Sequence, residues 1–82
     1  MVARVLLFGR LRDVAGWRER VFDPAPASLS ALRALISRDD PALGEALLAK
    51  GVQAAIDKVI VRGDAVLSAG SEVAFLAPMS GG

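Results

Sequence analysis

Residues 71–82 read SEVAFLAPMSGG, and this stretch decides how the rest of the sequence is interpreted. The residues that follow Glu72 are apolar and predict a strand that is buried on one face. Pro78 ends that strand, because proline has no backbone N–H to donate to a neighbouring strand. Gly81 and Gly82 lack a Cβ atom and can adopt backbone conformations that other residues cannot. The stretch therefore predicts a strand that runs directly into a short extended segment.

Length and composition predict one packed domain with a short tail. The chain has 82 residues, of which 54% are hydrophobic and 23% are charged, and this balance favours a globular core. We expect a domain over residues 1–77 and an extended C-terminal tail over 78–82. A net charge of +1 predicts neither a nucleic-acid partner nor a membrane surface. No apolar run is long enough to span a bilayer and no signal peptide is evident, so we expect a cytoplasmic protein.

The side-chain inventory restricts the chemistry that the protein could perform alone. The sequence contains no cysteine, histidine or tyrosine. Disulfides, thiolate nucleophiles and zinc-finger spacing are therefore excluded, and so is the commonest general base. We expect no metal site and no side-chain active site, and we interpret the domain as a scaffold.

The order of elements predicts an α+β fold. Ser28 is placed to cap a helix, and Asp40 with Pro41 is typical of the start of a second, shorter helix. Gly9 and Gly16 bracket a stretch that has room for one helical turn. Strands are predicted over 2–8, 18–22, one or two within 53–63, a short one over 65–67, and 72–77. The expected architecture is a small mixed sheet with helices on one face.

Strand parity divides the sheet residues between two faces, because successive side chains alternate. The charged residues Arg4, Lys58, Arg62 and Glu72 mark an outer face. By the same parity, Phe8, Ile60 and Leu76 fall on that face, and we call these three the outer patch. An exposed apolar cluster among charges predicts a docking surface. The opposite parity predicts a core that is formed by Val5, Leu7, Val59, Val61, Val73 and Phe75 together with Leu32, Leu35 and Ile36.

Four segments of the chain resemble one known family. The opening VLLFGRLRDVAG, the helical SLSALRALI, the middle strand AAIDKVIV and the ending LSAGSEVAFLAPMSGG are similar to the molybdopterin synthase small subunits, which are ubiquitin-like sulfur carriers. The resemblance covers essentially the whole chain. One departure is Asp57, where this family more often has asparagine.

The resemblance implies a β-grasp (ubiquitin-like) fold and a mechanism at the chain terminus. In this family a partner enzyme uses ATP to adenylate the terminal carboxylate, here that of Gly82, and a sulfur donor system then converts it to a thiocarboxylate. The tail, here Pro78, Met79, Ser80 and Gly81, inserts into the synthase large subunit, where the sulfur is transferred to a pterin precursor. The resemblance thus implies a non-catalytic sulfur-donor subunit of a two-subunit synthase, with no permanently bound cofactor. An extended segment from Pro78 to Gly82 reaches roughly 16–18 Å, which suffices to enter a partner's site.

Other functions remain open at this stage. Ubiquitin-like carriers also serve thiazole synthesis, tRNA thiolation and protein conjugation. The second predicted helix favours the molybdopterin branch over thiazole carriers, which are typically shorter. A different class of protein is an α+β interaction module in which the terminal glycines have no chemical role.

Overall fold

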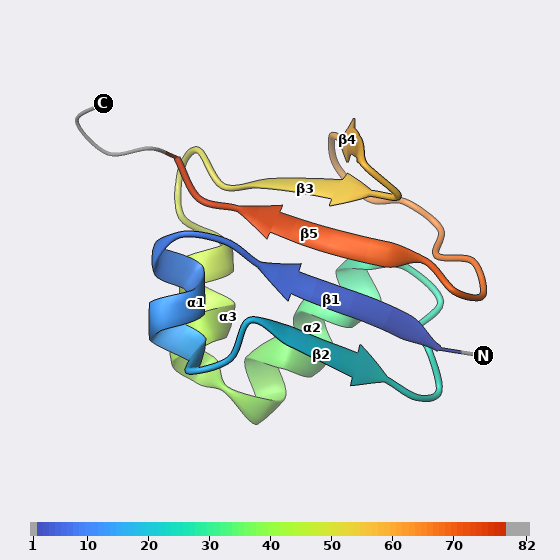
Figure 1. Cartoon of the computed structure of the whole chain (residues 1–82), viewed down its shortest axis with the longest axis horizontal. Helices are drawn as coiled ribbons and strands as arrows, with labels where there is room; N and C mark the ends of the chain where they lie inside the picture. Colours follow the sequence, from blue (N-terminus) through green and yellow to red (C-terminus); the bar gives the residue numbers. More distant parts are fainter. Residues whose placement is uncertain (1, 79–82) are drawn as a thin grey trace.

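The computed structural model describes residues 2–78. The chain forms five strands and three helices (Figure 1). In chain order these are β1 (Ala3–Leu7), α1 (Arg10–Ala15), β2 (Glu19–Phe22), α2 (Leu29–Asp39), α3 (Pro41–Leu47), β3 (Gln53–Ile56), β4 (Val59–Val61) and β5 (Glu72–Leu76).

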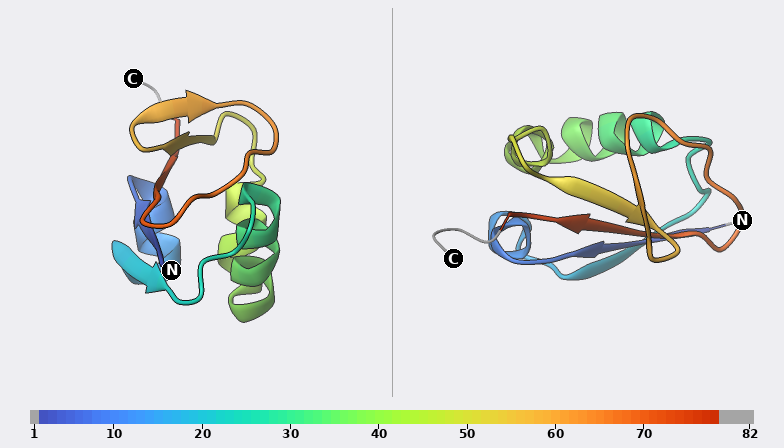
Figure 2. Two further views of the ribbon diagram at one scale, coloured as in Figure 1. Left: turned by 90° about the vertical axis from the view of Figure 1, so that its right-hand side faces the viewer. Right: turned by 90° about the horizontal axis from the view of Figure 1, so that it is seen from above.

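The five strands form one mixed sheet in the order β2-β1-β5-β3-β4. Strands β1 and β5 pair in parallel, and the other neighbouring pairs are antiparallel. Helices α2 and α3 cover one face, whereas α1 lies at the end of the sheet toward which β1 and β5 both run (Figure 2). The last strand therefore lies in the centre of the sheet and ends beside α1.

The helix starts predicted from the sequence are confirmed by their hydrogen bonds. Ser28 Oγ accepts from the backbone N–H of Ala31 at 3.1 Å, and Asp40 Oδ1 accepts from that of Leu43 at 3.2 Å. Each bond satisfies a donor that the first turn of a helix leaves without an intrahelical partner. Pro41 occupies the first turn of α3, where its missing N–H is not needed.

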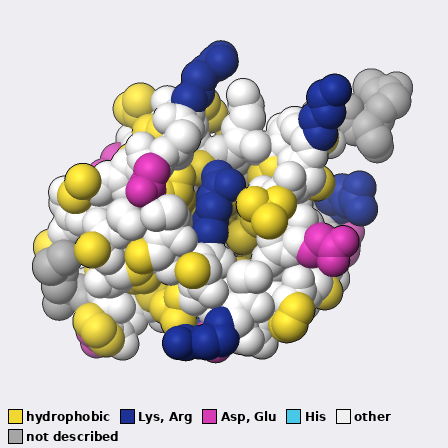
Figure 3. Space-filling view, turned by 180° about the vertical axis from the view of Figure 1, so that it is seen from behind, with side chains coloured by type: hydrophobic (Ala, Val, Ile, Leu, Met, Phe, Trp, Pro, Cys, Tyr) yellow, Lys and Arg dark blue, Asp and Glu magenta, His cyan; other side chains and the backbone are white. Residues whose placement is uncertain are grey.

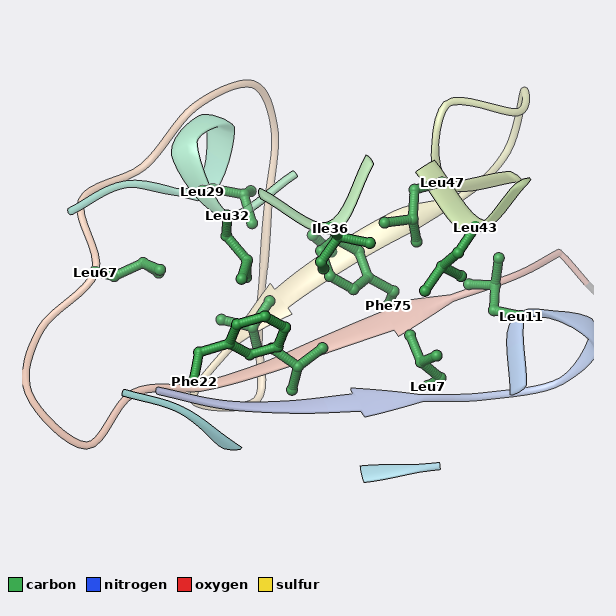
Figure 4. Packing of buried hydrophobic residues seen from close by; sticks show 13 residues of the cluster. Leu7, Leu11, Phe22, Leu29, Leu32, Ile36, Leu43, Leu47, Leu67 and Phe75 are labelled. Atoms are coloured by element: carbon green, nitrogen blue, oxygen red, sulfur yellow. The ribbon is translucent and has the colours of Figure 1, made fainter. Parts of the chain in front are cut away.

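The core lies between the inner face of the sheet and helices α2 and α3 (Figure 4). Leu7 and Phe75 are fully buried at its centre, and both had been predicted there. Leu11 of α1 also contributes, which ties the end of the sheet to α3. Of the other residues predicted to form the core, four are buried: Val5, Val73, Leu32 and Ile36. Leu35 and Val61 are half-buried and pack against the core.

The prediction that Val59 belongs to the core is wrong, because its side chain is 64% exposed. Residues 53–61 form two strands joined by a tight turn at Asp57 and Lys58, both of which have positive φ angles. This turn makes β4 a three-residue edge strand and leaves Val59 at the rim of the sheet. Val61, at the other end of β4, still packs against the core.

The helices are short, and the longest is α2 with 11 residues. Within residues 2–78, no helix has the length and apolar character needed to cross a membrane.

Candidate functional site

The three residues of the outer patch lie on the sheet face opposite α2 and α3. Phe8 is 47% exposed and Ile60 is 44% exposed, while Leu76 is half-buried. Phe8 follows β1, and its backbone N–H donates to the carbonyl oxygen of Phe75 at 3.2 Å. That bond continues the parallel register and places Phe8 beside Leu76.

A row of small apolar side chains connects Ile60 to the rest of the outer patch. Ile60 pairs with Ala55, Ala55 pairs with Ala74, and Ala74 pairs with Leu6. These residues occupy four neighbouring strands and share one face, because paired residues project to the same side of a sheet. The middle of the row is low and apolar, with Ala74 half-buried and Ala55 only 5% exposed, so the apolar surface open to another protein lies mainly at Ile60, Phe8 and Leu76.

Three of the charged side chains on the same face pair with one another. Arg4 pairs with Glu72 at 3.2 Å and with Glu19 at 3.5 Å. Exposed ion pairs of this kind contribute about 0–1 kcal/mol to stability. Their position at the start of β1 and β5 separates them from Phe8 and Leu76, which lie at the opposite ends of those strands.

The end of β5 is held between two glycines. Gly51 has a φ of +89°, and a Cβ placed there would lie 3.1 Å from Cγ of Pro78. Gly9 has a φ of +62°, and a Cβ placed there would lie 3.7 Å from that of Ala77. Both φ values lie in the left-handed region that favours glycine. The absence of a Cβ at Gly51 therefore lets the chain pass close to Pro78, where the tail leaves the domain.

The residues predicted to carry the chemistry, Met79, Ser80, Gly81 and Gly82, lie outside the described residues. The described part of the chain contains no group of three or more His, Cys, Asp or Glu side chains that could hold a metal ion.

Asp64 shows the clearest electrostatic perturbation, but it serves the fold. The backbone N–H of Ser30 donates to its carboxylate at 2.8 Å, and the Ser30 hydroxyl donates at 2.9 Å. The backbone N–H of Ala65 adds a third bond at 2.9 Å. These donors, chiefly those of Ser30, lower the pKa of Asp64 below its usual value of 3.8. Asp64 thereby ties the segment after β4 to the first turn of α2.

Comparison with protein-family models matches residues 5–82 to the ThiS family. The chain belongs to the ThiS family. A comparison with curated proteins gave no match.

Solved structures confirm the predicted fold. The chain is similar to SAMP1 from Haloferax volcanii, with a TM-score of 0.86, 24% identity and complete coverage of both chains. It is also similar to a putative molybdopterin converting factor subunit 1 from Pyrococcus furiosus, with a TM-score of 0.75, 22% identity, and 96% of this chain and 99% of that chain covered. A third match is the complex of subunits 1 and 2 of the molybdopterin-converting factor from Helicobacter pylori, with a TM-score of 0.72, 22% identity and complete coverage of both chains.

These similarities show that the ThiS family member described here has the β-grasp fold of ubiquitin-like sulfur carriers.

Sequence reasoning placed the outer patch on one face but missed the parts that complete the site. Ala55 was missed because strand pairing, which joins it to Ile60, is not visible in a sequence, whereas parity with Glu72 does place Ala74 on the outer face. Gly9 and Gly51 were visible as glycines, but their contacts with the end of β5 are long-range.

Proposed function

We propose that this protein is the sulfur-carrier subunit of molybdopterin synthase and that the carboxylate of Gly82 is its reacting group. The observation that carries the proposal is the ThiS family match, which extends to residue 82. The similarity to subunits of molybdopterin converting factors supports the choice of pathway. The outer patch and the fixed end of β5 supply a docking surface and a defined starting point for the tail.

The proposed reaction needs no side chain from this domain. A partner enzyme joins the Gly82 carboxylate to the phosphorus of AMP and releases pyrophosphate from ATP. A hydrosulfide-level sulfur from a donor system then adds to the carbonyl carbon, and AMP leaves with the electron pair of the broken C–O bond. The product is a thiocarboxylate. Since this activation consumes ATP, we place it in the cytoplasm.

Transfer would occur in the large subunit. The thiocarboxylate sulfur attacks a carbon of the pterin precursor that carries an oxygen substituent, and that oxygen leaves with the electron pair of the broken C–O bond, which gives an acyl thioester between carrier and pterin. Water then cleaves the acyl C–S bond, which leaves sulfur on the pterin and regenerates the Gly82 carboxylate. The thiocarboxylate needs no activating base from the carrier, which is consistent with a sequence that contains no histidine.

The test is pterin sulfuration by reconstituted synthase, with deletion of Gly82 as the variant. Deletion moves the carboxylate back by about 3.3–3.6 Å, and an error near 1 Å can already reduce a rate about a hundredfold. We expect the deletion variant to bind the large subunit, to unfold as the wild type does, and to lose sulfuration. Sulfuration by the deletion variant at the wild-type rate would contradict the proposal.

A second candidate function is conjugation to other proteins. It is favoured by the similarity to SAMP1, whose full name is small archaeal modifier protein 1. In that case an amine of a target would displace AMP from Gly82 and form an amide. Intact masses separate the two functions, since a carrier exchanges one oxygen for sulfur whereas a modifier becomes linked to its target.

A further inference from the structure

A small cavity adjoins the base of the tail on the side of the molecule that carries α3. Leu11, Ala46 and Val52 form its floor, Pro78 forms one wall, and Arg10 and Lys50 stand at its rim. The cavity contains no residue of the outer patch, and its floor is the edge of the core, because Leu11 belongs to the core and Ala46 and Val52 pack against it. Its position next to Pro78 means that a protein which holds the tail must pass close to it.

The floor is apolar and has room for a small side chain. Leu11 is 1% exposed, and Ala46 and Val52 are half-buried. The cavity volume is about 60 Å³, several times the roughly 10–15 Å³ that one water molecule requires. An apolar cavity is poorly suited to water, because water needs hydrogen-bond partners there. The floor therefore favours a small aliphatic group.

The rim is basic. Arg10 and Lys50 are both exposed, and among residues 2–78 neither forms an ion pair. Basic side chains are visible at the corner of the molecule where β5 ends (Figure 3). Within the described part of the chain, Arg4 and Arg20 are the only basic side chains that form ion pairs, so the distinguishing feature of Arg10 and Lys50 is their position on the two sides of one apolar cavity. Two cations without internal partners beside an apolar cavity favour an occupant with carboxylates next to a small apolar side chain.

The backbone fixes both cations relative to the tail. Arg10 directly follows Gly9, and Lys50 directly precedes Gly51. A Cβ placed on Gly9 or Gly51 would lie within 3.7 Å of Ala77 or Pro78 respectively, so the loops that carry the cations run beside the end of β5. The distance between this basic rim and the start of the tail is consequently set by the fold.

We propose that the cavity is a second recognition site for the synthase large subunit, distinct from the outer patch. A loop of the large subunit places a small aliphatic side chain on the apolar floor, and its flanking carboxylates pair with Arg10 and Lys50. This inference rests on the proposed function. The large subunit then contacts the carrier on both sides of the tail base, which fixes the direction in which the tail enters its site.

The test is the affinity of the carrier for the purified large subunit of the same organism, measured by titration calorimetry at several salt concentrations. Arg10→Glu combined with Lys50→Glu is expected to weaken binding about tenfold or more and to reduce its salt dependence. The matched control, Arg38→Glu combined with Arg18→Glu, changes net charge equally at exposed positions outside both the cavity lining and the outer patch, and its affinity is expected to stay within about threefold of wild type. Thermal unfolding of each variant checks that the fold is intact.

A second variant tests the floor independently of charge. Ala46→Leu fills the cavity from below and is expected to weaken binding, and Val52→Ile serves the same purpose if Ala46→Leu does not fold. If the rim and floor variants bind the large subunit as tightly as the wild type does, the inference is overturned. The proposed function still stands in that case, provided that the wild-type carrier binds the large subunit and supports sulfuration. A wild-type carrier that does not bind the large subunit would overturn both. Weakening in the charge control equal to that in the rim variant would also overturn the inference, since the effect would then be one of net charge.

Discussion

Phe75→Ala tests the inner and outer assignment of β5, on which the outer patch depends. The Phe75 side chain is fully buried, its strand neighbours are Leu7 and Ala54, and the guanidinium of Arg33 lies 5.6 Å from its ring centroid. Truncation of a buried phenylalanine to alanine leaves a cavity and destabilises a protein by about 3–5 kcal/mol. A domain of this length has a total stability of about 4–12 kcal/mol, at roughly 0.05–0.15 kcal/mol per residue. The variant should therefore lose a large share of its stability.

Leu76→Ala is the matched control, because Leu76 is the next residue and projects to the outer face. Its half-buried side chain should contribute about 1 kcal/mol to folding. Urea and thermal unfolding measure both variants, and we expect Phe75→Ala to lower the melting temperature by at least about 12 °C, from a shift of 4–8 °C per kcal/mol. Leu76→Ala should weaken binding to the large subunit more than it affects folding. Equal or reversed losses of stability would refute the assignment of β5.

Three further predictions concern other positions. Ile60→Asp should weaken large-subunit binding with little change in melting temperature, because Ile60 is exposed in the free domain; a large fall in melting temperature would show that Ile60 is core. Gly44→Ala should destabilise the domain by about 1–3 kcal/mol, because a Cβ at this position would clash with the Cα atom and side chain of Ser37. This loss is expected even though alanine normally favours a helix. Unchanged urea unfolding would contradict the close approach of α2 and α3. The folded-state pKa of Asp64 is lowered, so its contribution to stability is complete above the unfolded pKa and is lost as pH falls through the lower folded value. Asp64→Asn should therefore flatten the acid side of the stability–pH profile below about pH 4, and an unaltered profile would argue against the bonds to Ser30.

Local signals explain why much of the fold could be predicted. The helix starts at Ser28 and Asp40 were correct because a capping side chain bonds within three residues of its own position. The alternation of β5 was correct for the same reason, since parity within one strand needs no knowledge of its neighbours.

Long-range contacts explain the rest. Val59 was misplaced because Asp57 and Lys58 adopt positive φ angles without the glycine that normally marks such a turn. The packing of Pro78 on Gly51 joins residues from distant parts of the chain, so the cavity beside them had no signature in the sequence.

The central claim is that the Gly82 carboxylate carries sulfur, and an intact-mass measurement tests it most directly. The protein is incubated with ATP, the cognate adenylating enzyme and a sulfur donor, and its mass is compared with that of a sample from which ATP is omitted. The account predicts an ATP-dependent species in which one oxygen is exchanged for sulfur, with fragmentation placing the exchange on Gly82. An unchanged mass under conditions in which the same enzyme thiolates another carrier, or a sulfur placed at any other residue, would contradict it.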